Sequence, residues 1–253
     1  MDTTERVIAT VAFLAMDREY HGVTEISTAL GITKATAHRI LSSLLRLNWA
    51  ERDPHSRKYR VGVAATRLGL AVTSNFDLVT ASAPYMFQLV DFSKESVMLT
   101  VRVGLERMYL QQLPGVYEVR QTVELGKLYP LWNGAPGEAI LAHLEESEID
   151  KVMDKLHDSG MKVLASGQVL VPEEVRQSLE VIRRNGFAVS NGKRIPGAVA
   201  VAAPIHGSNS QVIGALSIGG PSTRFTPEVA IQAGPSVSAA AKNISMRLGN
   251  FSH

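Results

Sequence analysis

Apolar residues recur with helical spacing in three segments near the start of the chain. The first is predicted as an amphipathic helix with Thr3 or Thr4 as its cap. Its apolar face is formed by Val7, Ile8, Val11, Leu14 and Ala15. A short second helix is predicted over Glu25–Leu30, with Thr24 as N-cap, and a third from Thr33 to about Asn48. Gly31 lies between them and is expected to turn the chain with a positive φ. The spacing indicates a helix-turn-helix.

The predicted third helix separates an apolar face from a polar one. The apolar face comprises Ala37, Ile40, Leu41, Leu44 and Leu45. The opposite face comprises Ala35, Arg39, Ser42 and Arg46, flanked by Thr36, His38 and Ser43. Small hydroxyl side chains and arginines suit the major groove of DNA, where Arg pairs with guanine and Ser or Thr contacts bases and phosphates. A merely solvated charged face is the alternative, and the near-absence of acidic residues argues against it.

A basic hairpin is predicted directly after this helix. Trp49–Arg52 and Arg57–Val61 have the composition of short strands, and Asp53–Ser56 that of a turn. A hairpin after a recognition helix indicates a winged helix-turn-helix. Arg57, Lys58, Tyr59 and Arg60 are expected along phosphates or the minor groove, where contacts add affinity without reading sequence.

The charge distribution supports this interpretation. The whole chain of 253 residues has a net charge of only +2. Residues 31–70, however, contain eight Lys or Arg against two Asp or Glu. A basic segment of this kind is the electrostatic mark of a nucleic-acid partner.

The pattern changes after the hairpin. A helical stretch begins at Ala64, and a second covers Leu78–Phe92. Strands are predicted at Val97–Val103, Met108–Leu110, Val119–Gly126, Phe187–Ser190, Ala198–Ile205 and Val212–Ile218. Helices are predicted at Gly137–Leu144, Glu148–Leu156, Pro172–Arg184 and Pro227–Leu248. This order of elements predicts an α+β fold for the rest of the chain.

Several classes of function are disfavoured. The chain has no cysteine, which excludes disulfides, Cys-type zinc sites and thiol catalysis. No apolar run approaches the length that crosses a membrane, and no secretory signal is visible, so a cytoplasmic protein is expected. Neither a metal site nor a cofactor is indicated. A hydrolase-like enzyme using Ser217 stays as the alternative, although no nucleophile-elbow motif occurs and His206 is expected in an exposed turn.

The segment TKATAHRIL, followed by the hairpin and Tyr59-Arg60-Val61-Gly62, resembles the DNA-binding domain of the IclR family of bacterial transcriptional regulators. Three later segments resemble the effector domain of the same family: LGKLYPLWNGAPGEAILAHL, IRRNGFAVSNGKRIPGAVAVAAPI and VIGALSIGGPSTRFT. The family usually has serine where this chain has Ala35. The resemblance implies a winged helix-turn-helix domain over residues 1–62, a linker helix over 63–78, and a GAF/PAS-like domain with an antiparallel sheet over 79–253.

The resemblance also implies a site for a small organic molecule between the sheet and a loop. Carried over by position, the loop residues are Trp132, Asn133, Gly134, Ala135 and Gly137, and the sheet residues are Ser190, Ala200, Ser217 and Gly219. A glycine-rich loop that opens a helix offers backbone N–H groups to a carboxylate, although these glycines could equally serve only a turn. The family's histidine is Trp132 here, and Glu138 replaces a lysine. Gaining an indole favours an aromatic acid or a related catabolic intermediate. Met98 and Met108 could line this pocket, although core packing is the commoner role.

We therefore expect a ligand-responsive repressor of a catabolic operon. It should bind operator DNA as a homodimer or a dimer of dimers, because two half-sites need two recognition helices. The predicted DNA contacts are Thr33, Lys34, Ala35, Thr36, His38, Arg39, Ser42, Ser43, Arg46, Arg57, Lys58, Tyr59 and Arg60.

Overall fold

The computed structural model describes residues 1–17, 19–74, 77–159, 164–165, 167 and 169–250. The chain divides into two compact units, Met1–Phe76 and Asp77–His253. The division falls inside the predicted linker 63–78, whose residues 75 and 76 lie outside the described set. That residues 63–78 act as a linker stays a prediction. Among the described residues, no helix is long and apolar enough to cross a membrane.

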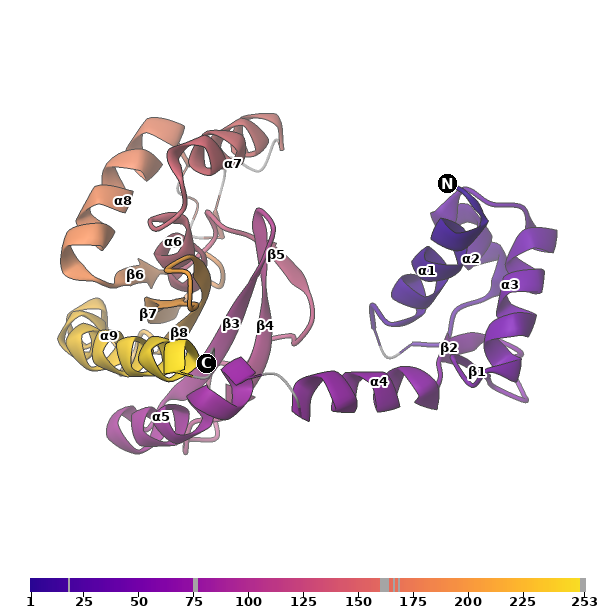
Figure 1. Ribbon diagram of the computed structural model, residues 1–253, viewed down its shortest axis with the longest axis horizontal. Helices are drawn as coiled ribbons and strands as arrows, with labels where there is room; N and C mark the ends of the chain where they lie inside the picture. The colour runs from indigo at the N-terminus through magenta and orange to yellow at the C-terminus, as the bar shows by residue number, and fades with distance from the viewer. Residues whose placement is uncertain (18, 75–76, 160–163, 166, 168, 251–253) are drawn as a thin grey trace. The chain divides into compact units, whose positions relative to one another are not determined.

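The first unit contains four helices and a two-stranded antiparallel sheet within its described residues (Figure 1). The helices are α1 (Thr3–Leu14), α2 (Val23–Leu30), α3 (Lys34–Arg46) and α4 (Val63–Ser74). The strands are β1 (Ala50–Arg52) and β2 (Tyr59–Val61), with Glu51 opposite Arg60. The helix-turn-helix and the following hairpin are thus confirmed as elements.

The helix starts of this unit differ in part from those predicted. Thr33 caps α3 as expected, and its Oγ1 accepts a hydrogen bond from the Thr36 N–H at 3.2 Å. Asp2, rather than Thr3 or Thr4, caps α1, because its carboxylate pairs with the Glu5 N–H while Glu5 reaches back to the Asp2 N–H. Helix α2 begins after Gly22, so Thr24 lies inside it. Gly31 ends α2 with φ 63°, as the turn required.

The core of the first unit joins all three helices before the hairpin to the two strands. Leu14, Ile26 and Leu41 are fully buried at its centre. Ile40, Leu44, Ala50 and Tyr59 complete the cluster. Three of the apolar residues predicted for α3, Ile40, Leu41 and Leu44, are therefore in this core, and Ala37 is also buried, so the polar face of the helix points away from the core.

The second unit is built on a six-stranded antiparallel sheet with the order β5-β4-β3-β8-β7-β6. The strands are β3 (Ser96–Val103), β4 (Glu106–Leu113), β5 (Leu128–Pro130), β6 (Ala188–Asn191), β7 (Ala198–His206) and β8 (Val212–Pro221). The helices are α5 (Asp77–Ser93), α6 (Ala135–Leu141), α7 (Glu146–Asp158), α8 (Pro172–Asn185) and α9 (Pro227–Asn250). The predicted antiparallel α+β architecture is confirmed.

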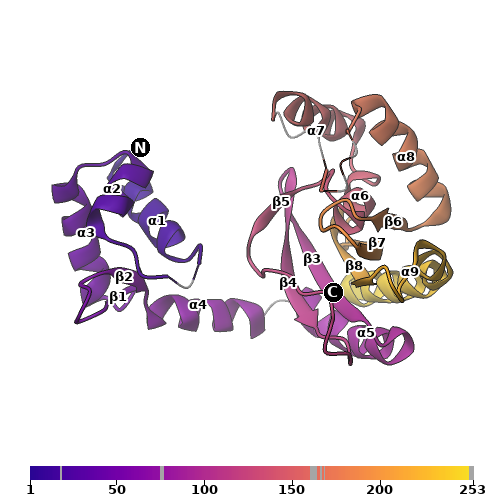
Figure 2. The ribbon, with the colours of Figure 1, turned by 180° about the vertical axis from the view of Figure 1, so that it is seen from behind.

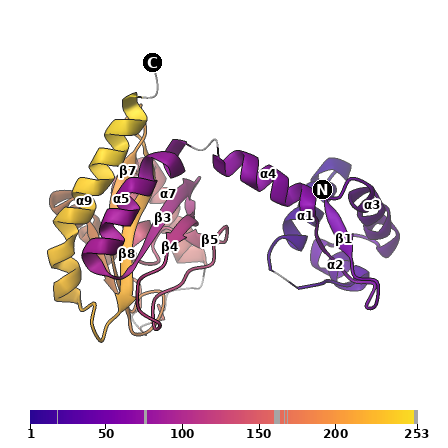
Figure 3. The ribbon, with the colours of Figure 1, turned by 90° about the horizontal axis from the view of Figure 1, so that it is seen from below.

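Helices cover both faces of this sheet (Figure 1 and Figure 2). On one face, α5 packs on β3 and β4, α9 packs on β6, β7 and β8, and these two helices lie side by side (Figure 3). On the other face, α6 packs on β6, β7 and β8, and α8 packs on α6. A buried apolar cluster runs between α6 and the sheet and includes Leu131, Ala139 and Ala202.

One predicted strand is wrong. Residues 119–126 form no strand, and the third strand of this region is β5, which pairs with β4 so that Tyr129 lies opposite Arg107. Of the residues that suggested a strand, Val119 and Thr122 are exposed, Val119 with 73% of its surface accessible, and Val123 is half-buried. The segment instead lies against the sheet edge, where the Gln121 carbonyl accepts hydrogen bonds from Ser96 Oγ and Gln112 Nε2.

Candidate functional site

The polar face of α3 is exposed along its whole length. Ala37, Ile40, Leu41 and Leu44 are buried, whereas Lys34, Ala35, His38, Arg39, Ser42 and Arg46 are exposed and Thr36 and Ser43 are half-buried. No acidic residue occurs in the first turn of this helix. In the part of the chain that the structure describes, no carboxylate pairs with Arg39 or Arg46. The helix therefore presents hydroxyls and two arginines without a carboxylate partner on a surface that can meet an anionic partner.

Hydrogen bonds between side chains and the backbone fix the basic tip of the hairpin. The Asp53 carboxylate accepts from the Ser56 N–H at 2.7 Å, and Arg57 takes a left-handed conformation with φ 57°. Arg52 Nε donates to the Arg57 carbonyl at 3.3 Å. The side chains of Arg57 and Lys58 are exposed, in agreement with their predicted position at a surface.

Two residues predicted as DNA contacts have other roles in the hairpin. Tyr59 is 4% exposed and belongs to the core of the first unit, so its side chain is not part of the outer surface. Arg60 pairs with Glu51 at 2.5 Å and lies over the Tyr20 ring at 4.6 Å. A strand places alternate side chains on opposite faces, and this alternation directs Tyr59 inward. We assign both residues to fixing the hairpin on the unit.

His21 joins the hairpin to the helices. Its backbone N–H donates to the Tyr59 carbonyl at 2.7 Å and its carbonyl accepts from the Tyr59 N–H at 2.9 Å. Its ring lies between Asp17, at 2.9 Å, and Glu25, at 2.7 Å. Burial alone would lower the pKa of His21, but the hydrogen bonds to Glu25 and Asp17 outweigh it and raise the pKa. The protonated ring is therefore the form that this arrangement favours.

In the second unit, the predicted sheet residues share the face that α6 covers. Ser190 lies opposite Ala200, and Ala200 lies opposite Gly219 on the next strand. Ser217 is two residues from Gly219 on β8 and therefore points to the same face. The predicted loop precedes and begins α6, so the structure brings loop and sheet together.

A small cavity lies between them, with a volume of about 20 Å³. Four predicted residues line it: Gly134, Ala135, Ser190 and Ala200. Gly134 has φ 89°, a conformation that side chains rarely adopt, and a Cβ there would lie 3.8 Å from Arg107 Nη2 and 4.0 Å from Ser190 Oγ. A water molecule needs roughly 10–15 Å³, so this volume holds about one water.

The other five predicted residues adjoin the cavity without lining it. Trp132 is 6% exposed and packs in the apolar cluster beside α6, so the indole supplies core rather than a stacking face. The Ser217 hydroxyl donates to the Met98 carbonyl at 3.3 Å. Gly219 is covered by Gln121, whose Oε1 would lie 2.2 Å from a Cβ at that glycine. Gly137 packs against the Leu131 carbonyl. The carbonyl of Asn133 accepts from Arg107.

No sequence pattern indicated the charged groups at this cavity. Arg107, on β4, is fully buried, and its Nη2 donates to the Asn133 carbonyl at 2.6 Å. Arg194, Tyr109 and Gln121 line the cavity directly. Arg107 and Tyr109 are both buried on β4, between half-buried neighbours. That alternation could have drawn attention to Arg107, but the predicted strand began only at Met108.

An ion pair is buried beside these residues. Lys193 Nζ lies 2.5 Å from Glu138 Oε1, and the Glu138 side chain is 5% exposed. Burial raises the pKa of Glu138, while Lys193 and Arg107 act to lower it. The residue that replaces the family's lysine is thus the partner of a lysine from the β6–β7 connection.

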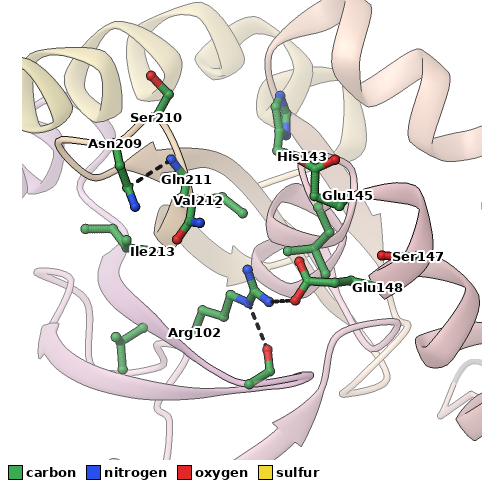
Figure 4. A pocket seen from close by; sticks show the side chains of 13 residues that line it. Arg102, His143, Glu145, Ser147, Glu148, Asn209, Ser210, Gln211, Val212 and Ile213 are labelled. Atoms are coloured by element: carbon green, nitrogen blue, oxygen red, sulfur yellow. Dashed lines mark hydrogen bonds and ion pairs between the residues drawn. The ribbon is translucent and has the colours of Figure 1, made fainter.

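A larger polar hollow of about 830 Å³ lies elsewhere in the unit (Figure 4). Arg102 points across it to Glu148, and its Nε donates to the Gly104 carbonyl at 2.8 Å. His143 stands at another wall and packs edge-on against His206 at 5.4 Å. His206 is therefore half-buried at the end of β7, not exposed in a turn as predicted, and burial lowers its pKa. The cation of this hollow already has a carboxylate partner.

Comparison with known proteins covers almost the whole chain. Residues 3–54 match the IclR helix-turn-helix domain, and residues 70–246 match the family described as bacterial transcriptional regulator IclR C-terminal. HTH-type transcriptional regulator KipR of Bacillus subtilis is 29% identical over 90% of this chain and 89% of its own length. HTH-type transcriptional repressor AllR of Escherichia coli is 28% identical over 98% of this chain and 91% of its own.

Solved structures share the fold. An IclR transcriptional regulator from Alicyclobacillus acidocaldarius superposes with a TM-score of 0.86, at 25% identity over 98% of both chains. An IclR homologue from Microbacterium hydrocarbonoxydans, solved with 4-hydroxybenzoate, superposes with a TM-score of 0.81, at 23% identity over 98% of this chain and 99% of its own. The matched proteins are transcriptional regulators, so the hydrolase-like alternative has no support. Since the two family matches together account for most of its length, the chain belongs to the IclR family of bacterial transcriptional regulators.

Proposed function

We propose that this DNA-binding regulator is a repressor whose affinity for an operator is set by a small organic acid bound in its second unit. The observation that carries the DNA-binding half is the exposed face of α3, which is rich in Arg, Lys, Ser and Thr and lacks acidic residues. Repression is proposed by analogy with AllR, whose name describes a repressor.

In this proposal α3 reads base edges and the hairpin contacts the backbone. Arg39 lies mid-helix on the exposed face, where a guanidinium can reach guanine O6 and N7. Thr33 and Lys34 at the helix start, and Arg57 and Lys58 on the hairpin, would meet phosphates. Tyr59 and Arg60 are left out of the contact set because the core and Glu51 engage them.

The effector is proposed to bind at the cavity between α6 and the sheet. Buried arginine nitrogens without partners lie beside it, and they favour an anionic ligand. The 4-hydroxybenzoate held by the Microbacterium relative shows that a protein of this fold accommodates an aromatic carboxylate. For this chain the carboxylate is the supported feature, because Trp132, the residue that suggested an aromatic ligand, lies in the core.

We further propose that two copies bind a palindromic operator, as dimers or as dimers of dimers in the cytoplasm. One recognition helix reads one half-site, and two half-sites about one helical turn apart need two of them. Ligand would change the spacing of the DNA-binding units through residues 63–78. Such a response requires that the ligand bind the two arrangements with different affinity.

Selection of DNA by the purified full chain tests this function. Random duplexes would be enriched by binding at moderate salt, and the enriched sequences would be compared with the promoter regions next to the gene. The proposal expects a palindromic consensus and an affinity that falls steeply with salt. Enrichment of no sequence, or binding whose affinity does not change with salt, would contradict it.

A further inference from the structure

Two arginines at the cavity of the second unit have no carboxylate partner in the part of the chain that the structure describes. Arg107 is completely buried, and its Nε and Nη1 make no hydrogen bond. Arg194 lines the cavity, and its buried Nη2 also lacks a partner. An unpaired buried cation is costly, because desolvation is not offset by attraction to a partner.

Both guanidinium groups lie over the same two aromatic rings. Arg107 is 4.9 Å from the Tyr109 ring centre and 5.3 Å from that of Tyr129. Arg194 is 5.5 Å from the first ring centre and 5.6 Å from the second. Ring faces attract a guanidinium but accept none of its in-plane N–H groups. The rings thus hold the two cations close to each other, while Arg107 Nε and Nη1 and Arg194 Nη2 have no hydrogen-bond partner.

The nearby ions do not balance this charge. Glu138 is the buried carboxylate beside Arg107, and it already pairs with Lys193 at 2.5 Å. Arg107, Arg194, Lys193 and Glu138 together therefore have a net charge of two positive units. A ligand with one negative charge would leave one guanidinium uncompensated, whereas a ligand with two would neutralise both.

The inner cavity and an outer pocket meet at the Gln121 side chain. An outer pocket of about 270 Å³ shares Gln121, Ile195 and Ala198 with the inner cavity. Gln121 is placed over Gly219, and its buried Oε1 has no hydrogen-bond partner. No polar contact holds that oxygen, so displacing it loses no hydrogen bond and joins the two volumes.

We propose that the effector of this regulator is a small dicarboxylate, with one carboxylate bound by Arg107 and the other by Arg194. It enters from the outer pocket and displaces the Gln121 side chain. The inference rests on the proposed effector site and narrows its ligand class by charge. Two guanidiniums on separate elements, β4 and the β6–β7 connection, suit two separate carboxylates better than a single phosphate.

Titration of the protein with four acids separates the effect of the ligand's charge on binding from the effect of an aromatic ring. Butyrate and succinate form the aliphatic pair, and benzoate and phthalate the aromatic pair, each titrated by calorimetry at fixed pH and ionic strength. We expect at least one dicarboxylate to bind, and to bind at least about tenfold more tightly than its matched monocarboxylate. Equal binding within both pairs, tighter binding of inorganic phosphate, or no heat with any of the acids would overturn the proposal.

Three variants test which arginine binds each carboxylate of the ligand. Arg194→Gln should abolish the preference for the dicarboxylate. Arg107→Gln should weaken the binding of both acids of a pair by roughly 10- to 100-fold. Arg102→Gln is the matched control, because Arg102 lies directly opposite Arg107 on β3 but is paired with Glu148. Its ligand affinity should stay unchanged. A loss in Arg102→Gln as large as in Arg107→Gln would mean that the effect is structural.

Melting without ligand gives an independent readout. Arg107→Gln removes an uncompensated buried charge, so its melting temperature should be no more than about 3 °C below the wild type, or above it. A structural arginine would show a clear loss. If Arg107→Gln fails to fold, the acid panel and Arg194→Gln still decide the matter. Operator binding without ligand, measured alongside, separates the two proposals: intact selective DNA binding with no preference for dicarboxylates rejects only this inference.

Discussion

Replacing Arg39 by alanine separates base reading from folding. The side chain is exposed, and no carboxylate pairs with it in the described residues, so its loss leaves no buried group unsatisfied. Alanine is also the residue with the best helix propensity, so we expect the free energy of unfolding to change by less than about 0.5 kcal/mol. Any large effect on DNA binding must then come from the interface.

The expected loss follows from one guanidinium contact per recognition helix. A good bidentate contact to guanine is worth about 1–3 kcal/mol. If two helices bind one operator, the loss in specific affinity is about 2–6 kcal/mol, or at least roughly 30-fold. Non-specific DNA loses only one cation per subunit and should be affected far less.

Fluorescence anisotropy measures both affinities, the specific one with the selected operator and the non-specific one with a scrambled duplex of the same composition. Titrations would be run at the same salt concentration, because affinity depends strongly on it. Thermal melting of the same samples controls for folding. An equal loss on both duplexes would refute base reading by Arg39, and a fall in melting temperature of many degrees would refute its placement on a free face.

Three further predictions concern the first unit. Lys58→Ala should weaken binding to operator and to scrambled DNA alike, and it should lower the slope of log affinity against log salt by about one per subunit. Titration at several salt concentrations measures both effects. A loss of affinity for the operator alone would contradict a phosphate contact. Leu41→Ala should lower the free energy of unfolding by about 2–5 kcal/mol because Leu41 is fully buried, whereas Ser42→Ala at the neighbouring exposed position should change it very little. Calorimetric melting of Leu41→Ala should show the transition of the first unit roughly 10 °C or more lower. Comparable shifts in both variants would argue against the described core. The raised pKa of His21 implies a contribution to stability that is fully present below the ordinary histidine pKa of 6.5 and is lost as pH rises through the folded-state pKa. The melting temperature of the wild type should therefore fall over this pH range, and that of His21→Gln should change less. Identical plots of melting temperature against pH would exclude this role of the ring.

Sequence patterns located most of the elements because periodicity reports burial. The stripe Ala37, Ile40, Leu41 and Leu44 faces the core as its spacing required. The sheet positions Ser190 and Ala200, which the family resemblance supplied, lie opposite each other. The residues that cap the helices were harder to predict. Thr3, Thr4 and Thr24 have suitable side chains, but Asp2 and Gly22 occupy the cap positions. Which residue caps a helix depends on where the chain enters it, and neighbouring candidates differ little in energy.

The chemistry of the cavity was less predictable than its location. Trp132 has an amphipathic ring that fits a pocket or a core, and only packing distinguishes them. Arg107 becomes important because it is fully buried near Gly134 and, among the described residues, pairs with no carboxylate. Such features arise between segments far apart in sequence, so no local pattern contains them.

The small volume of the cavity has a consequence for sensitivity. At the proposed effector site about 20 Å³ is available, so an organic acid enters only when the Gln121 side chain has moved. The apparent dissociation constant is then the intrinsic one divided by the fraction of open molecules. The proposed site would therefore fill only at a metabolite concentration above its intrinsic dissociation constant, so the amide side chain would set the threshold of the response.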